Sequence, residues 1–144
     1  MIAIGSDHGG YLLKEELKKH LDAKRIKYID FGTDSTASVD YPVYAKRVCE
    51  AIQEGRCDKG ILICGTGIGM SMCANKCKGI RAAVCGDHFS AEFTRKHNNA
   101  NVLCMGARTI GAGVALQIAD IFLTTEYEGG RHERRIAMMM DLEK

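Results

Sequence analysis

The chain has 144 residues, of which 46% are hydrophobic and 26% charged, and its formal net charge at pH 7 is +2. This balance predicts one globular domain over residues 1–144 and excludes a disordered, collagen-like or fibrous chain. The near-neutral charge argues against a nucleic-acid or membrane-surface partner. Apolar runs fall short of the roughly 20 residues that a membrane-spanning helix needs. The first residues do not resemble a signal peptide, so we expect a cytoplasmic protein.

The seven cysteines do not predict a disulfide framework or a zinc ribbon. Their number is odd, and no two of them form a C-x-x-C pair. Most of them lie singly within apolar strand or helix patterns, as small core side chains do. We therefore expect reduced thiols that pack in the core, with Cys64 as the exception.

Short apolar runs alternate along the chain with segments of helical periodicity. The helix at 41–54 has Pro42 in its first turn, where proline is well tolerated. The strands are expected at 1–5, 27–31, 60–64, 80–85 and 101–105. The helices are expected at 11–23, 41–54, 69–76, 90–97, 112–122 and 131–143.

Strands that alternate with helices indicate a parallel sheet with both faces covered. Right-handed crossovers then make a Rossmann-like, doubly wound α/β fold with five strands and an extra C-terminal helix. In such folds, ligands bind at the carboxyl ends of the strands, near a point where the strand order reverses. Functional residues are therefore sought at those ends.

The glycine-rich turn after the third expected strand is the sharpest local signal. Gly65, Gly67 and Gly69 leave backbone N–H groups uncovered, and a helix is expected to begin there, so the turn is suited to bind an anion. Cys64 lies at the lip of this turn, where the same field favours the thiolate form. The pattern indicates a reactive cysteine.

A nucleotide-binding turn beside an ordinary core cysteine is the alternative interpretation. A Walker loop is excluded because no Gly-Lys-Ser/Thr follows, and the dinucleotide pattern G-x-G-x-x-G fails because residue 70 is Met. Asp87, however, lies at a suitable sequence distance for an acid that binds ribose. A non-catalytic nucleotide-binding domain therefore remains open.

Other polar residues near the expected strand ends also have two interpretations. Asp7 could cap the first helix, and His97 could contact a helix dipole. The placement of Asp7 and His8 beside the glycine-rich turn favours a functional role. Arg131 and Arg135 are four residues apart on one helix face, a spacing that suits a phosphate clamp.

Six short motifs lie along the chain in collinear order, and together they resemble the type B ribose-5-phosphate isomerases. The wider family includes allose-6-phosphate and galactose-6-phosphate isomerases. The resemblance covers essentially the whole chain. The motifs are Gly5-Ser6-Asp7-His8-Gly9-Gly10, Asp40-Tyr41-Pro42, Ile63-Cys64-Gly65-Thr66-Gly67-Ile68-Gly69, Ala74-Asn75-Lys76, Arg95-Lys96-His97-Asn98 and Glu128-Gly129-Gly130-Arg131-His132.

The resemblance implies a role for each matching residue. Cys64 would be the base that moves a proton between C1 and C2, and His97 the acid/base that opens the furanose ring. Asp7 and Thr66 would assist at the ring and hydroxyl oxygens. The residues that would bind substrate are Asp7, His8, Tyr41 and Asn98 at the sugar hydroxyls, Gly65, Thr66, Gly67, Ile68 and Gly69 at the enediolate, and Arg108, Arg131 and Arg135 at the phosphate.

The resemblance also implies the reaction, a metal-independent interconversion of D-ribose 5-phosphate and D-ribulose 5-phosphate. A thiolate beside backbone N–H groups can perform this chemistry, so nothing in the sequence requires a metal or nicotinamide cofactor. Allose 6-phosphate is the alternative substrate, whereas the intact Cys64 motif disfavours a galactose phosphate. We expect a homodimer, or a dimer of such dimers, with composite sites that His97, Asn98 and Arg108 enter from the partner chain.

Overall fold

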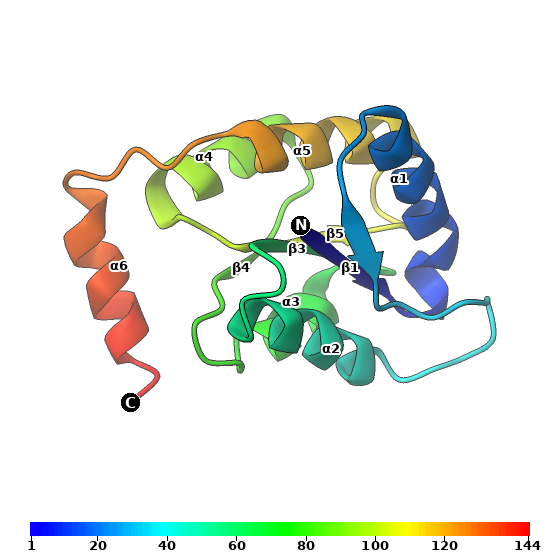
Figure 1. Ribbon diagram of the computed structural model, residues 1–144, viewed down its shortest axis with the longest axis horizontal. Coiled ribbons are helices and arrows are strands. Elements are labelled where there is room, and N and C mark those ends of the chain that lie inside the picture. The colour runs from blue at the N-terminus through cyan, green and yellow to red at the C-terminus, as the bar shows by residue number, and fades with distance from the viewer.

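Five parallel strands form one sheet in the computed structural model, which describes residues 1–144 (Figure 1). The strands are β1 (Ile2–Ser6), β2 (Tyr28–Asp30), β3 (Lys59–Cys64), β4 (Ala82–Val84) and β5 (Val102–Gly106). Their order across the sheet is β2-β1-β3-β5-β4. The strand order therefore reverses between β1 and β3, which is where ligands bind in this class of fold.

Helices cover both faces of the sheet, and the last helix projects beyond it (Figure 1). The first face is covered by α1 (Tyr11–Ala23), α4 (His88–Asn98) and α5 (Ala112–Thr124), and the second by α2 (Tyr41–Gln53) and α3 (Ile68–Ala74). The C-terminal helix is α6 (His132–Asp141). The predicted five-stranded, doubly wound fold with an extra C-terminal helix is confirmed. None of these helices is both long and apolar enough to cross a bilayer.

The predicted boundaries agree with the structure to within two residues at every strand and α-helix. One element was missed, a 3-10 turn at His8–Gly10. It begins at Asp7, whose carboxylate accepts a hydrogen bond from the Gly10 N–H at 3.1 Å. The expectation that Asp7 could cap a helix is therefore confirmed for this short turn.

The strand residues alternate between two hydrophobic cores because successive side chains point to opposite faces of a sheet. In β3, Ile61 and Ile63 pack in the core beneath α1 and α5. Leu62 and Cys64 pack in the core beneath α2 and α3. The side chain of Cys64 therefore emerges on the α2 and α3 side, at the carboxyl end of the central strand.

A buried lysine fixes the start of the long segment between β2 and α2. Lys14 is 1% exposed, and its ammonium group lies 2.6 Å from the carboxylate of Asp30. The other oxygen of Asp30 accepts a hydrogen bond from the Gly32 N–H at 2.8 Å, and Thr33 N–H donates to the Ser6 carbonyl at 3.1 Å. The ion pair therefore anchors this segment beside the end of β1.

The pKa of Asp30 predicts an acid-sensitive contribution to stability. Burial acts to raise this pKa, but hydrogen bonds from Lys14, Gly32 N–H and Lys18 outweigh it and hold the pKa below its usual 3.8. Such a carboxylate stabilises the fold above its unfolded-state pKa, and this contribution is lost as pH falls through the lower folded-state pKa. Asp30→Asn should therefore lower the urea midpoint clearly at pH 7, and much less near pH 3.

The exposed carboxylate Asp58, which pairs with the N-terminal ammonium at 3.4 Å, supplies a matched control. Exposed ion pairs contribute little to stability, so Asp58→Asn should leave the urea midpoint almost unchanged at both pH values. If both variants shift the midpoint equally at pH 7, the Lys14–Asp30 pair does not anchor the fold.

Candidate active site

The glycine-rich turn between β3 and α3 presents a backbone N–H group to the sulfur of Cys64. Gly67 has a φ of +80°, a left-handed conformation that glycine adopts without strain. A side chain there would also collide with the backbone of Met105, only 2.9 Å from the Cβ position. In this conformation, Gly67 N–H donates to Cys64 Sγ at 3.1 Å. The sequence pattern thus produces a turn that holds a hydrogen-bonded thiol.

Burial favours the protonated form of most of the other cysteines. Burial raises the pKa of Cys85 to about 11 and raises those of Cys57, Cys73 and Cys104 as well. Cys64 is itself only 6% exposed. It is distinguished because its sulfur alone accepts a hydrogen bond from a backbone N–H. This contact distinguishes Cys64 from the core thiols.

The end of β1 touches the end of β3 because two glycines there have no side chains. Gly10 packs against the Ile63 carbonyl so closely that a Cβ atom would have no room. A Cβ atom on Gly9 would lie 3.3 Å from the Gly65 nitrogen. This contact places Asp7, which is 7% exposed, beside the glycine-rich turn. One Asp7 oxygen is occupied by the Gly10 N–H, and the other has no protein partner.

His8 and Tyr41 are positioned by the segment that leads into α2. The Val39 N–H donates to Nδ1 of His8 at 3.1 Å. The neutral imidazole must then carry its proton on Nε2, which becomes a donor for a ligand oxygen. The ring of Tyr41 lies over Gly69, where a Cβ atom would be 2.7 Å from the ring. The ring of Tyr41 therefore lies against the glycine-rich turn, and His8 is fixed by the segment that leads into α2.

Arg108 lies on the same side, which corrects one expectation. Its N–H donates to the Gly65 carbonyl at 3.0 Å. Its Cδ lies 3.6 Å from the position that a Gly65 Cβ would occupy. The β5 strand is parallel to β3, so the loop after β5 emerges next to the turn after β3. Arg108 therefore reaches the turn of its own chain, and no partner chain is needed to supply it.

His97 and Asn98 lie at the opposite edge of the sheet. The α4 helix begins after the carboxyl end of β4 and ends before the amino end of β5. A helix of its 11 residues spans roughly 16 Å, so its last turn lies far from Cys64. Within one chain the two proposed proton-transfer groups are not brought together.

The surroundings of His97 come from α4 and from the residues around the start of α6. Its ring stacks on that of His132 with centroids 4.2 Å apart, and its Nε2 lies 3.7 Å from a Glu128 oxygen. Burial lowers the pKa of His132, and the neighbouring His97 and Arg131 lower it further. His132 is therefore largely neutral at pH 7.

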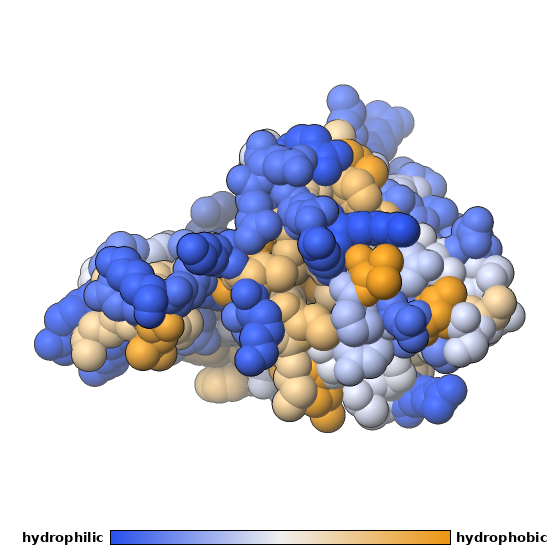
Figure 2. Space-filling view, turned by 90° about the horizontal axis from the view of Figure 1, so that it is seen from below, coloured by the Kyte–Doolittle hydropathy of each residue, from blue (hydrophilic) through white to orange (hydrophobic).

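The three arginines that the resemblance assigns to the phosphate do not lie together in one chain: Arg108 follows the carboxyl end of β5, whereas Arg131 and Arg135 lie on the side of the amino ends of the strands. Arg131 directly precedes α6, Arg135 lies four residues later, and both are exposed. The start of α6 contacts the last turn of α4, where the rings of His132 and His97 stack. These arginines therefore lie near His97 and not near Arg108 (Figure 1). Figure 2 shows α6 standing apart from the body, with apolar residues in the hollow between them. The residues predicted to act together are therefore divided between the two ends of the strands in one chain.

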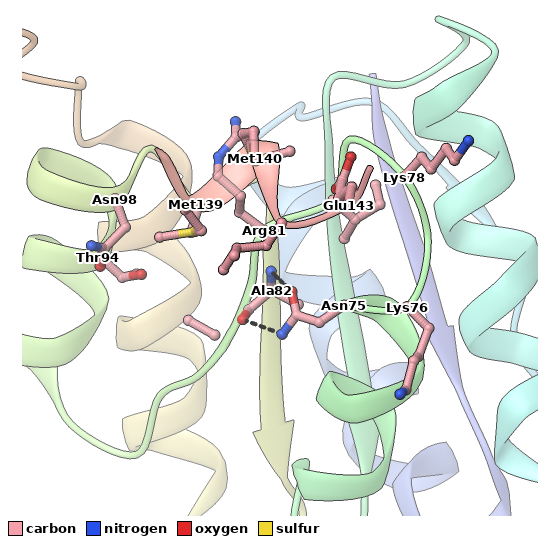
Figure 3. A pocket seen from close by; sticks show the side chains of 14 residues that line it. Asn75, Lys76, Lys78, Arg81, Ala82, Thr94, Asn98, Met139, Met140 and Glu143 are labelled. Carbon is pink, nitrogen blue, oxygen red and sulfur yellow. Dashed lines mark hydrogen bonds between the residues drawn. The ribbon is translucent and has the colours of Figure 1, made fainter. Parts of the chain in front are cut away.

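A cavity of about 650 Å³ lies between α6 and the body of the protein (Figure 3). Its walls include Asn98, Met139 and Met140, and no residue of the glycine-rich turn lines it. The side chain of Asn75 forms two hydrogen bonds with the backbone of Ala82, at 3.0 and 2.8 Å, and so joins the end of α3 to β4. Sequence reasoning missed this cavity, because its walls come from segments far apart in the chain.

Asp87 does not support the nucleotide-binding alternative. Its carboxylate caps α4, accepting hydrogen bonds from the Ser90 N–H at 2.7 Å and from the Ser90 hydroxyl at 2.8 Å. Both oxygens are thus engaged in a local structural role. Asp87 therefore has a structural role at the start of α4.

Comparison with known proteins matches residues 2–139 to the model of the ribose/galactose isomerase family. The chain belongs to this family. Ribose-5-phosphate isomerase B of Escherichia coli is 47% identical over 143 residues, which cover 99% of this chain and 96% of that protein. The predicted resemblance to the type B ribose-5-phosphate isomerases is confirmed.

Two solved structures of the same class superpose on nearly the whole chain. The ribose-5-phosphate isomerase B of Clostridium thermocellum has a TM-score of 0.97 and 49% identity, covering 99% of this chain and 96% of its own. The enzyme of Mycoplasma genitalium, solved with bound ribulose 5-phosphate, has a TM-score of 0.94 and 42% identity over 99% of this chain and 95% of its own. The fold is shared throughout.

We expect the hydrogen bond from the Gly67 N–H to control the rate at which Cys64 is alkylated. Gly67→Ala should slow alkylation of Cys64 by iodoacetamide at least several-fold, because the new Cβ would push the turn away from Met105 and weaken the N–H···S contact. Gly79→Ala is a matched control, since Gly79 has nearly the same φ of +79° but nothing within 4 Å of its Cβ position. Both variants incur the roughly 1 kcal/mol cost of a left-handed alanine.

Peptide mass spectrometry of timed samples measures the labelling of each cysteine. Only Gly67→Ala should change the rate at Cys64, while Cys104, which is fully buried, should stay unlabelled in both variants. Equal rates at Cys64 in the two variants would show that the hydrogen bond does not control its reactivity.

Proposed function

We propose that the chain interconverts D-ribose 5-phosphate and D-ribulose 5-phosphate, with residues 1–144 acting as one catalytic domain. The observation that carries the proposal is the N–H···S hydrogen bond from Gly67 to Cys64, at the carboxyl end of the central strand. The bound ribulose 5-phosphate in the related Mycoplasma genitalium structure supports the choice of substrate. Aldose–ketose isomerisation requires one base and a group that stabilises an oxyanion, and this turn offers both.

Cys64 is the base in this proposal. Its thiolate takes the proton from C2 of the open-chain aldose, and the electron pair forms an enediolate as negative charge moves to O1. A proton then shifts from the O2 hydroxyl to O1, and Cys64 returns its proton to C1, which leaves a hydroxyl group at C1 and a carbonyl group at C2. The backbone N–H groups of Gly65, Thr66 and Gly69, which have no acceptor within the chain, would stabilise the oxyanion. One such donor typically contributes about 100-fold or more in rate.

His97 opens the furanose ring before this step. Ring opening requires a proton at the ring oxygen and removal of the proton from the O1 hydroxyl, which an imidazole can exchange. Asp7 and Thr66 would assist at these oxygens. Four groups would bind the sugar hydroxyls: the free oxygen of Asp7, the Nε2–H of His8, the Tyr41 hydroxyl and the Asn98 amide.

Two copies of the chain are needed to complete one site. Cys64 and His97 lie at opposite edges of one sheet, so a two-fold dimer must place His97 and Asn98 of one copy against Cys64 of the other. Arg131 and Arg135 would arrive with His97 and meet Arg108 and His8 around the phosphate. Apolar side chains are exposed beside both half-sites, including Met72, which is 65% exposed on α3, and Met138, which is 63% exposed on α6.

Each proposed step uses groups of the protein chain, so we expect turnover of ribose 5-phosphate to persist after EDTA treatment. Cys64→Ala should reduce kcat at least about 1,000-fold, because it removes the base from the proton transfer. Cys73→Ala, a half-buried cysteine on the neighbouring helix α3, is the control and should retain activity. A coupled assay with ribose 5-phosphate and, separately, allose 6-phosphate measures both rates.

Three results of this assay would contradict the proposal. Faster turnover of allose 6-phosphate would change the substrate, and loss of turnover with EDTA would remove the metal-independent mechanism. An active Cys64→Ala variant would remove Cys64 from its role. Each outcome concerns a different part of the proposed reaction.

Mixed dimers test the composite site. Inactive Cys64→Ala and His97→Ala chains that are unfolded together and refolded should form hybrids with one doubly defective and one intact site. Random pairing makes half of the dimers hybrid, so recovery should approach about a quarter of wild-type activity. Confirmed hybrids that remain inactive would show that each site lies within one chain.

The positions of Arg135 and Arg108 at opposite ends of the strands allow two further mixing experiments. Arg135→Ala chains should also recover activity when mixed with Cys64→Ala chains, because Arg135 belongs to the half-site that carries His97. Arg108→Ala chains should not complement Cys64→Ala, because Arg108 lies beside the Gly65 of its own chain. Recovery in the Arg108 mixture would place that arginine in the partner's site.

A further inference from the structure

Three metal-binding side chains meet at the amino edge of the sheet. The donor atoms of His97, Glu128 and His132 all lie within 4.8 Å of one another. His97 belongs to the last turn of α4, Glu128 precedes α6 and His132 begins it. We propose that these three residues form a binding site for a divalent transition-metal ion such as Zn²⁺.

The backbone holds the three side chains in place. The Glu128 N–H donates to the Lys96 carbonyl at 3.2 Å, which ties Glu128 to the residue before His97. Gly129 and Gly130 then adopt left-handed φ values of +70° and +61°, which reverse the chain direction. The His132 N–H donates to the Gly129 carbonyl at 3.3 Å. The turn thereby directs both Glu128 and His132 at His97.

Two imidazoles and one carboxylate form a donor set that suits zinc. Zinc binds histidine nitrogen at about 2.0–2.1 Å, and sites with three protein ligands leave a fourth position for water. The two rings are stacked at 16° to each other, so one of them must turn to direct its lone pair at a shared ion. Glu128 is 45% exposed and has room to follow.

The neighbouring charges limit the expected affinity. Arg131 and Arg135 lie close enough to disfavour positive charge on His132, and they would oppose a cation as well. Glu128 is the ligand that supplies negative charge. We therefore expect reversible binding that is weaker than at a closed structural zinc site.

The consequence for catalysis rests on the proposed function. An ion bound to His97 would occupy the lone pair that ring opening requires. Zinc should then inhibit turnover of the cyclic ribose 5-phosphate, and EDTA should reverse the inhibition. The edge of the sheet that donates His97 to the active site would thus also regulate it.

Histidine-selective NMR of the full-length protein tests the binding directly. Zn²⁺ is titrated into EDTA-treated, dialysed protein that carries ¹⁵N-labelled histidine, with a phosphine reductant that keeps the thiols reduced. The ring nitrogens of His97 and His132 should shift together, and those of His20 should not. Glu128→Gln and His132→Ala should each weaken this binding at least about tenfold, as expected on loss of a ligand.

His20→Ala is the matched control. His20 is also half-buried and lies 2.8 Å from the carboxylate of Asp120, but Lys24 occupies the place of a third ligand, 3.0 Å from the other oxygen. It should leave the titration unchanged. Cys64→Ala is a second control, for zinc binding by the thiol. It should bind zinc as the wild type does, because the proposed ligands are His97, Glu128 and His132.

Binding that persists in both Glu128→Gln and His132→Ala, or that vanishes in Cys64→Ala, would overturn the site. The titration needs no turnover, so it remains decisive if the protein does not isomerise ribose 5-phosphate. Conversely, if the enzyme is active but the ring-nitrogen shifts of His97 and His132 do not change on addition of zinc, the metal site alone is refuted. The two proposals therefore fail separately.

Discussion

A parallel sheet places the carboxyl ends of all its strands at one edge, and this constraint divides the proposed active-site residues into two groups. The residues that follow β1, β3 and β5 emerge together, which brings Asp7, Cys64 and Arg108 to one edge. A crossover helix must return the chain to the other edge before the next strand begins. His97 ends such a helix, so the topology itself separates it from Cys64.

The close contact at the carboxyl edge depends on missing side chains. Gly10 lies against the Ile63 carbonyl, and Gly67 lies against the backbone of Met105. A larger residue at either position would push apart the loops that follow β1, β3 and β5. The proposed half-site therefore depends on the packing of backbone against backbone, and the catalytic side chains only complete it.

Most of the fold could be predicted from the sequence because its signals are local. The apolar spacing in residues 11–23 and the position of Pro42 each identified a helix start or a helix face without reference to the rest of the chain. The glycine-rich turn was also recognisable, since its conformation depends on its own residues. The placement of Asp7 beside the glycine-rich turn was predictable for the same reason, because the carboxyl ends of parallel strands lie together.

The errors arose where a residue's position depends on distant parts of the chain. Arg108 was assigned to the partner chain, yet the pairing of β5 with β3 places it beside Gly65. The contact between Val39 and His8 spans 31 residues and has no sequence signature. The cavity beneath α6 depends on how that helix leaves the body, which periodicity within the helix does not encode.

The same separation explains why the amino edge has chemistry of its own in a single chain. His97, His132 and Glu128 form a polar cluster beside exposed arginines, while Met138 and Met139 further along α6 are exposed. In the proposed dimer, this edge acts only against the carboxyl edge of the partner. His97 would then have two environments. The local one sets the orientation of its ring, and the second one, in the partner, would determine which bond it acts on. Substitutions at Glu128 and His132 would alter the local environment without touching the substrate, so in the proposed dimer this cluster would set the orientation in which His97 meets the partner's residues.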